Sequence, residues 1–138
     1  MKQLLLFALL GGLSLAATAQ TVPENEVRIH GYRIALPAKA HTMLLGEFDI
    51  YKGSYELSNG DVLVLYQRGR HLYGYVGNGE DKELVAAASN VFVALDRKLK
   101  VTIDRDNFGG VSGEVLMEAP ANTALANAGQ VIRLVAAR

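Results

Sequence analysis

Residues 51–66 have the sequence YKGSYELSNGDVLVLY, in which two runs of strand-forming residues flank Asn59-Gly60. This arrangement is the strongest short-range sequence signal for a β-hairpin. The second run, residues 62–66, is apolar at every position, so its periodicity does not say which side chains point inward. We therefore predict two antiparallel strands here, the second of which is covered at least in part on both faces.

The length of the turn decides the register of this hairpin, and two registers are open. If Asn59 and Gly60 alone form the turn, Tyr55 lies opposite Val64. If residues 58–60 form a three-residue loop with Gly60 left-handed, Tyr55 lies opposite Leu63 instead. Because side chains alternate along a strand, a slip of one residue exchanges the inner and outer faces.

Turn-forming residues recur along the rest of the chain at intervals typical of short antiparallel strands. An alternating run at 27–36 is predicted to be a strand, and further strands are predicted near residues 49–57, 62–68, 71–76, 83–88, 91–95, 98–104, 111–118 and 130–136. Segment 38–47 fits a short helix opened by Pro37 or an irregular connection, and 119–129 fits a brief helix or an ordered loop. The sequence thus predicts an all-β fold, an antiparallel up-and-down barrel of about eight strands with room for one short helix.

The N-terminus has the features of an export signal. Lys2 supplies a positive charge, residues 4–10 an apolar core, and Ala17-Thr18-Ala19 a small-residue cleavage site. The apolar run is too short for a membrane-spanning helix. We predict a signal peptide at 1–19, no membrane anchor after its cleavage, and a periplasmic or secreted protein. A polar lead-in at 20–26 then precedes a single barrel domain at 27–138.

The composition excludes several classes of site. The chain has no cysteine, so it can form neither disulfides nor thiolate–metal sites. Its formal net charge is zero at pH 7, so no basic field is available to hold nucleic acid or an anionic membrane surface. Arg68, Arg70 and His71 form one small basic group, which we interpret as a solvated hairpin tip.

We predict no catalytic residue, no cofactor and no metal site. Residues 110–113, GVSG, lack the spacing of a nucleophile elbow. His30, His41 and His71 lie far apart in the sequence, with no short ligand spacing between any two. The run 104–109, DRDNFG, begins like a calcium loop but has phenylalanine at a ligand position. We interpret it as a solvated turn whose aspartates bond to the local backbone.

A pattern of aromatic, glycine and aliphatic residues extends over roughly residues 48–118. Its members are Phe48, Tyr51, Gly53, Tyr55, Leu57, Gly60, Leu63, Leu65, Leu72, Tyr73, Phe92, Val101 and Ile103. This pattern resembles the small lipocalin-like β-domain often fused C-terminally to β-lactamase-type serine hydrolases and peptidases, here standing alone behind a signal peptide. The resemblance implies a barrel but no reaction, because no Ser-x-x-Lys motif is present. That family tolerates proline at the position of Asn59, which favours the three-residue loop.

Five of the six tyrosines cluster in the first half of the barrel sequence: Tyr51, Tyr55, Tyr66, Tyr73 and Tyr75. A tyrosine has an apolar body and a polar tip, so these side chains either line a ligand cavity or pack in the core and at the rim. A barrel of about eight strands has room for its own side chains or for one small ligand. We name the five as candidate ligand-binding residues, although packing is the outcome we expect.

Two functions follow from this sequence. The first is an exported, non-enzymatic module that binds a small amphipathic ligand. The alternative is a protein-interaction or structural envelope module with a packed barrel, which engages an envelope protein or forms a homodimer. An internal cavity with converging tyrosine hydroxyls would favour the first function. A filled barrel beside an exposed apolar patch would favour the second.

Overall fold

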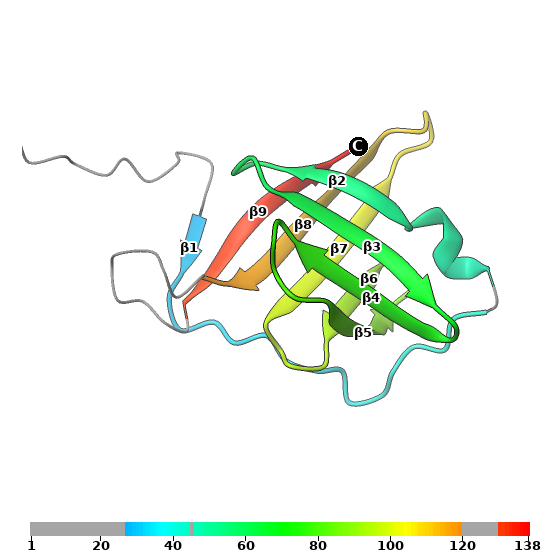
Figure 1. The fold of residues 1–138 in the computed structure, drawn as a ribbon, viewed down its shortest axis with the longest axis horizontal. Helices are drawn as coiled ribbons and strands as arrows, with labels where there is room; N and C mark the ends of the chain where they lie inside the picture. Colours follow the sequence, from blue (N-terminus) through cyan, green and yellow to red (C-terminus); the bar gives the residue numbers. More distant parts are fainter. Residues whose placement is uncertain (1–26, 45, 120–129) are drawn as a thin grey trace, which may run out of the picture.

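The structure, a computed structural model, describes residues 27–44, 46–119 and 130–138. Its elements are β1 (Val27–Ile29), a 3-10 turn (Glu47–Ile50), β2 (Gly53–Leu57), β3 (Val62–Arg68), β4 (His71–Val76), β5 (Lys82–Ala88), β6 (Val91–Ala94), β7 (Leu99–Arg105), β8 (Val111–Glu118) and β9 (Val131–Ala137). Strands β2 to β9 form a closed, eight-stranded antiparallel barrel, and β1 is an additional strand (Figure 1). The predicted fold class is confirmed.

Strand β9 closes the barrel. Each strand from β2 to β9 pairs with the next one in the sequence, which is the up-and-down topology. β9 pairs with β8 along its whole length, but only its last residues reach β2, where Ala136 and Ala137 lie opposite Leu57 and Glu56. The first half of β9 pairs with β1 instead. The second edge of β9 is therefore shared between two short partners.

The hairpin between β2 and β3 has the three-residue loop. Tyr55 lies opposite Leu63. The Leu57 amide donates to the Asp61 carbonyl at 2.9 Å, and Gly60 has φ +88°, a left-handed conformation that glycine adopts without strain. The inward-pointing side chains of the hairpin are all buried: Tyr55, Leu57, Leu63 and Leu65. The three-residue alternative is confirmed.

The predicted strand at 27–36 is wrong after Ile29. The chain turns at His30-Gly31, where Gly31 has φ +74°. Residues 32–36 keep an alternating burial pattern because Ile34 packs against the outside of the barrel, yet they form no strand. The alternation in the sequence thus reflects one-sided packing without a hydrogen-bonded ladder.

The segment before β2 also differs from the prediction. β2 begins at Gly53 and not near residue 49, because residues 47–50 form the 3-10 turn. The described residues between Pro37 and this turn form no helix, so the irregular alternative holds for them. The predicted signal, the lead-in at 20–26 and most of the connection at 119–129 lie outside the described residues. Within the described part of the chain, no helix has the length and apolar character needed to cross a membrane.

The interior of the barrel is filled by its own side chains. Tyr55 is completely buried and belongs to the main apolar cluster. The other large side chains of this cluster that are fully buried are Phe92, Leu63, Leu65, Leu99, Val101, Ile103, Val115 and Leu134. Burial of this apolar surface is the main favourable contribution to the stability of the barrel.

A second apolar cluster covers one side of the barrel from outside. Ile34, in the segment that follows β1, is buried against Val93, Leu116 and Val131, which project outward from β6, β8 and β9. The segment after β1 runs along the outside of the barrel to the 3-10 turn (Figure 1). The described residues include no such cover over β3 and β4, so the predicted two-sided cover of residues 62–66 is not seen there.

The 3-10 turn closes one end of the barrel. Phe48 packs edge-on against Phe92, with 5.1 Å between ring centroids, and Tyr51 lies 5.3 Å from the same ring. Side chains of β2, of β7 and of the residue after β9 bind the last carbonyl of the turn and the two carbonyls that follow it. These bonds run from Arg105 Nη1 to Ile50 O at 3.0 Å, from Tyr55 Oη to Tyr51 O at 2.6 Å, and from Arg138 Nη1 to Lys52 O at 2.9 Å.

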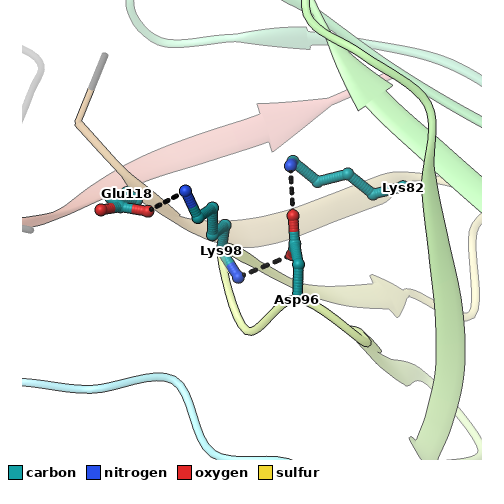
Figure 2. Close-up of polar contacts among 4 residues, drawn as sticks. All are labelled: Lys82, Asp96, Lys98 and Glu118. Atoms are coloured by element: carbon teal, nitrogen blue, oxygen red, sulfur yellow. Dashed lines mark hydrogen bonds and ion pairs between the residues drawn. The ribbon is translucent and has the colours of Figure 1, made fainter. Parts of the chain in front are cut away.

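Charged side chains join the strands at the opposite end of the barrel. Lys82 Nζ of β5 lies 2.5 Å from Oδ2 of Asp96 in the β6–β7 turn, and Figure 2 draws this ion pair as a dashed line. The Lys98 amide donates to Asp96 Oδ1 at 2.9 Å, and Lys98 Nζ lies 3.2 Å from Glu118 Oε2 at the end of β8. Burial alone would raise the pKa of the Asp96 carboxyl, but hydrogen bonds and charge from Lys82 and Lys98 outweigh it and lower this pKa.

Candidate functional site

The five candidate tyrosines divide into two groups that do not meet. Tyr51 and Tyr55 are buried inside the barrel. The hydroxyl of Tyr55 is satisfied by the Tyr51 carbonyl, and Arg138 lies over the Tyr55 ring with its Cζ 4.9 Å from the centroid. Burial raises the pKa of the Tyr55 hydroxyl, although Arg138 and Arg105 oppose this effect. These two rings fill the interior, and Tyr55 also lines a separate groove of about 510 Å³ together with Ser54, Glu56, Val62, Ala137 and Arg138.

Tyr66, Tyr73 and Tyr75 lie on the outer face of β3 and β4. The rings of Tyr66 and Tyr73 stack with 5.5 Å between centroids and 19° between planes, and Tyr75 meets Tyr66 at 67°. Arg68 lies over both stacked rings, 5.7 Å from the Tyr66 centroid and 5.1 Å from the Tyr73 centroid. We call these four residues the tyrosine face.

The surroundings of the tyrosine face are partly apolar and partly charged. Val64 lies opposite Tyr75, and Val62, further along β3, is exposed. Asp81 lies 3.8 Å from Arg68, and its hydrogen bond raises the pKa of the Tyr66 hydroxyl. Aromatic rings with an arginine are enriched in protein interfaces. On this surface the three rings are half-buried, whereas Val62 and Arg68 are exposed.

A cleft of about 490 Å³ opens where the 3-10 turn closes the barrel. Pairing between β4 and β5 ends at Leu72 and Leu84, but β5 continues to Ala88. The segment before the 3-10 turn binds the part of β5 that extends beyond this pairing, because the backbone amide of His41 donates to the Ala86 carbonyl at 2.8 Å. The cleft lies between this segment, the β3–β4 tip and β5, and we call it the mouth cleft.

The mouth cleft has an apolar floor and a polar rim. The floor is formed by Phe48, Leu72, Leu84 and Ala86. The rim is formed by His41, Gln67, Arg70, His71 and Glu83. Ligand sites combine mainly apolar walls with a few placed polar groups, in volumes of about 300–1,000 Å³. The volume of the mouth cleft lies in this range, although its lining is almost as polar as it is apolar, and none of the five candidate tyrosines lines it.

The rim groups differ in how far they are already engaged. His71 Nδ1 lies 2.6 Å from Glu83 Oε1, and the side-chain amide of Gln67 donates to the Gly69 carbonyl at 3.0 Å. His41 Nε2 lies 3.9 Å from the Glu47 carboxylate. Among the described residues, Arg70 makes no hydrogen bond, ion pair or ring contact. Its guanidinium is therefore the rim cation that is free to bind a ligand.

Sequence reasoning missed this site. It treated His41 and His71 as unrelated and Arg70 as part of a solvated tip, whereas all three line one cleft. The basic residues at the tip gave the only signal, but their neighbour in the fold, the segment around His41, is distant in the sequence. No group of three or more metal-ligating side chains is present among the described residues.

Of the predicted turn at 104–109, residues 106–109 form a turn, whereas Asp104 and Arg105 end β7 and Asp104 accepts a hydrogen bond from the Asn90 side chain at 3.0 Å. Asp106 Oδ1 accepts hydrogen bonds from the amides of Phe108, at 2.8 Å, and Gly110, at 2.7 Å. The carboxylate thus binds its own backbone, as such turns do. Phe108 itself projects into solvent.

No protein-family model, no curated protein and no solved structure matches the chain.

Proposed function

We propose that the protein is a non-enzymatic binding module that holds a small amphipathic ligand in the mouth cleft. The observation that carries this proposal is the cleft itself, an apolar floor beneath a polar rim at the end of a filled barrel. The rim of this cleft also carries Arg70, which makes no hydrogen bond or ion pair among the described residues, and this supports a ligand site at the mouth of the barrel. A concave cleft encloses a small ligand on several sides.

The test is a binding measurement with simple amphiphiles and a variant that fills the cleft. Ala40 is exposed and lines the cleft, so Ala40→Trp adds bulk there without overpacking the core. Ala38 is equally exposed in the same segment but does not line the cleft, so Ala38→Trp is the matched control. Octanol and octanoate are titrated into each protein, and backbone amide shifts are followed by NMR.

We expect saturable shifts in the segment around His41 and in β5 for the unaltered protein and for Ala38→Trp. Ala40→Trp should weaken binding roughly tenfold, because the indole occupies space that the alkyl chain would fill. Absence of saturable shifts with both probes would overturn the proposal. So would shifts that are confined to the tyrosine face.

The tyrosine face favours a second candidate function, a protein-interaction module. Its stacked rings are half-buried on the outer face of β3 and β4, Arg68 is exposed beside them, and the exposed Val62 extends the apolar surface. A second copy of the chain is the simplest partner. The double variant Tyr66→Ser, Tyr73→Ser removes the stack, and Val135→Ser alters an exposed apolar residue on β9 as a control.

Sedimentation equilibrium distinguishes the outcomes for this second function. A dimer that the tyrosine variant loses and Val135→Ser keeps would support it. A protein that is monomeric, and that crosslinks to no partner in the cells that produce it, would exclude it.

Two further proposals concern the cellular location of the protein and its family relationship. Lys2, the short apolar run and Ala17-Thr18-Ala19 support export by a cleaved signal peptide. The aromatic and glycine pattern of residues 48–118, together with an up-and-down barrel, supports kinship with the lipocalin-like domain of serine hydrolases. N-terminal sequencing of the protein from its native cells tests the cleavage after Ala19.

A further inference from the structure

We infer that the ligand of the mouth cleft is an anionic amphiphile, a carboxylate with an alkyl or aryl tail, and that Arg70 binds its head group. This inference rests on the proposed function of the cleft and adds the charge of its ligand. It assigns one role to the rim, which recognises the head group, and another to the floor, which holds the tail.

The charges of the rim carry the argument. Arg70 has no partner among the described residues. Glu83, the acidic residue that lines the cleft, already lies 2.6 Å from His71. A cationic head group would therefore meet an unpaired guanidinium and a carboxylate that is already engaged. An anionic head group meets the unpaired guanidinium directly.

The chemistry of arginine narrows the class of anion. Its planar guanidinium offers five N–H donors in a fork that matches the two oxygens of a carboxylate. His71 and Gln67 lie on the same rim and add polar surface beside Arg70. A carboxylate held there directs its tail toward Leu72, Leu84 and Phe48, where the apolar floor replaces water.

Three probes with the same tail separate head-group recognition from binding of the tail. Octanoate, octanol and octylamine are anionic, neutral and cationic at neutral pH. We expect octanoate to bind roughly tenfold more tightly than octanol, as a charge-assisted hydrogen bond at a partly exposed site allows, and octylamine to bind most weakly. Raising the salt concentration should narrow this difference, because salt screens exposed charges.

Variants of Arg70 identify the residue responsible. Arg70→Gln should bind octanoate no better than octanol, and Arg70→Lys should keep part of the preference because it keeps the charge but loses the fork. Arg33 is exposed, outside the cleft and of the same charge, so Arg33→Gln is the matched control and should leave the preference intact.

The outcomes separate the two proposals. If neither octanoate nor octanol binds in the cleft, the proposed function fails. If both bind there equally, or if Arg70→Gln keeps the preference for octanoate, the binding function stands and the inference about the anion is overturned. A preference for octylamine would also overturn it.

Discussion

At the scale of single residues, Tyr55 both fills the interior of the barrel and binds the 3-10 turn. Its ring is completely buried, and its hydroxyl donates a hydrogen bond to the Tyr51 carbonyl at 2.6 Å. A ligand at this position would have to displace the ring and leave a buried carbonyl without a donor. The polar tip of Tyr55 therefore joins the 3-10 turn to the barrel core.

We expect Tyr55→Phe to lower the free energy of unfolding by about 1–2 kcal/mol, because the Tyr51 carbonyl stays buried without its donor. Tyr75→Phe is the matched control, since the Tyr75 hydroxyl makes no hydrogen bond within the described residues, and its effect should be close to zero. Urea unfolding measures both variants. Equal effects would show that the hydroxyl of Tyr55 is not what joins the turn to the core.

The sequence predicted that the candidate tyrosines lie on strands, but it did not predict which side of the barrel each one faces. Tyr55 and Tyr66 are both strand residues of one hairpin, and the register places the first inside and the second outside. That register depends on a loop of three residues instead of two, and the local pattern of 62–66 is apolar on both faces. The division of the tyrosines was thus decided by turn geometry and not by composition.

At the scale of elements, the β6–β7 turn carries an ion pair in addition to its backbone hydrogen bonds. Asp96 bonds to Lys82 on β5 and to the amide of Lys98, which joins three strands at the end of the barrel opposite the mouth cleft. Because these contacts lower the pKa of Asp96, the charged carboxylate stabilises the folded state.

The stability that Asp96 contributes depends on pH. A lowered pKa means that the contribution is present above the ordinary value of 3.8 and is lost as the pH falls below it. Asp96→Asn should therefore cost about 0.5–1 kcal/mol near neutral pH, as partly exposed ion pairs do, and nothing in strong acid.

Thermal unfolding of both proteins across this pH range measures the Asp96 effect. Glu80→Gln, which removes a carboxylate that makes no ion pair within the described residues, is the control. A difference between Asp96→Asn and the unaltered protein that persists undiminished in acid would contradict the assignment.

The elements that sequence alone could place are those with turn residues at both ends. The strands from β3 to β8 start and end within a residue or so of the predicted bounds, because glycine, asparagine or aspartate marks each reversal. The strand predicted at 32–36 was wrong because a segment that packs one side against the outside of a barrel has the same alternation of apolar residues as a strand. The mouth cleft depends on strands of unequal length, which a local pattern does not encode.

At the scale of the whole molecule, the outer surface of the barrel is asymmetric. Ile34 and its neighbours cover β6, β8 and β9, whereas β3 and β4 expose the tyrosine face. The mouth cleft lies between these two regions, next to the segment that leads from the covered side to the 3-10 turn. A ligand in the cleft would therefore contact both the barrel and this segment.

We expect the barrel to open first between β2 and β9, because these strands pair only at Glu56–Ala137 and Leu57–Ala136. Two hydrogen bonds between Ser58 and Val135 extend this pairing by one residue on each side. Native-state hydrogen exchange should show the Ser58 and Val135 amides exchanging at least tenfold faster than amides in β7 and β8, which pair along their full length. Uniform exchange across all strands would contradict this expectation.

The double role of β9 also has a consequence for how the chain reaches its native state. β9 follows the other barrel strands in the sequence, yet it must satisfy open edges of β1, β2 and β8 at once. Until residues 131–137 are available, those edges remain unpaired, and unpaired edges recruit strands from other molecules. We therefore expect pairing of β9 to protect these edges from aggregation. Variants that delay the docking of β9 should lower the yield of folded protein before they lower its equilibrium stability.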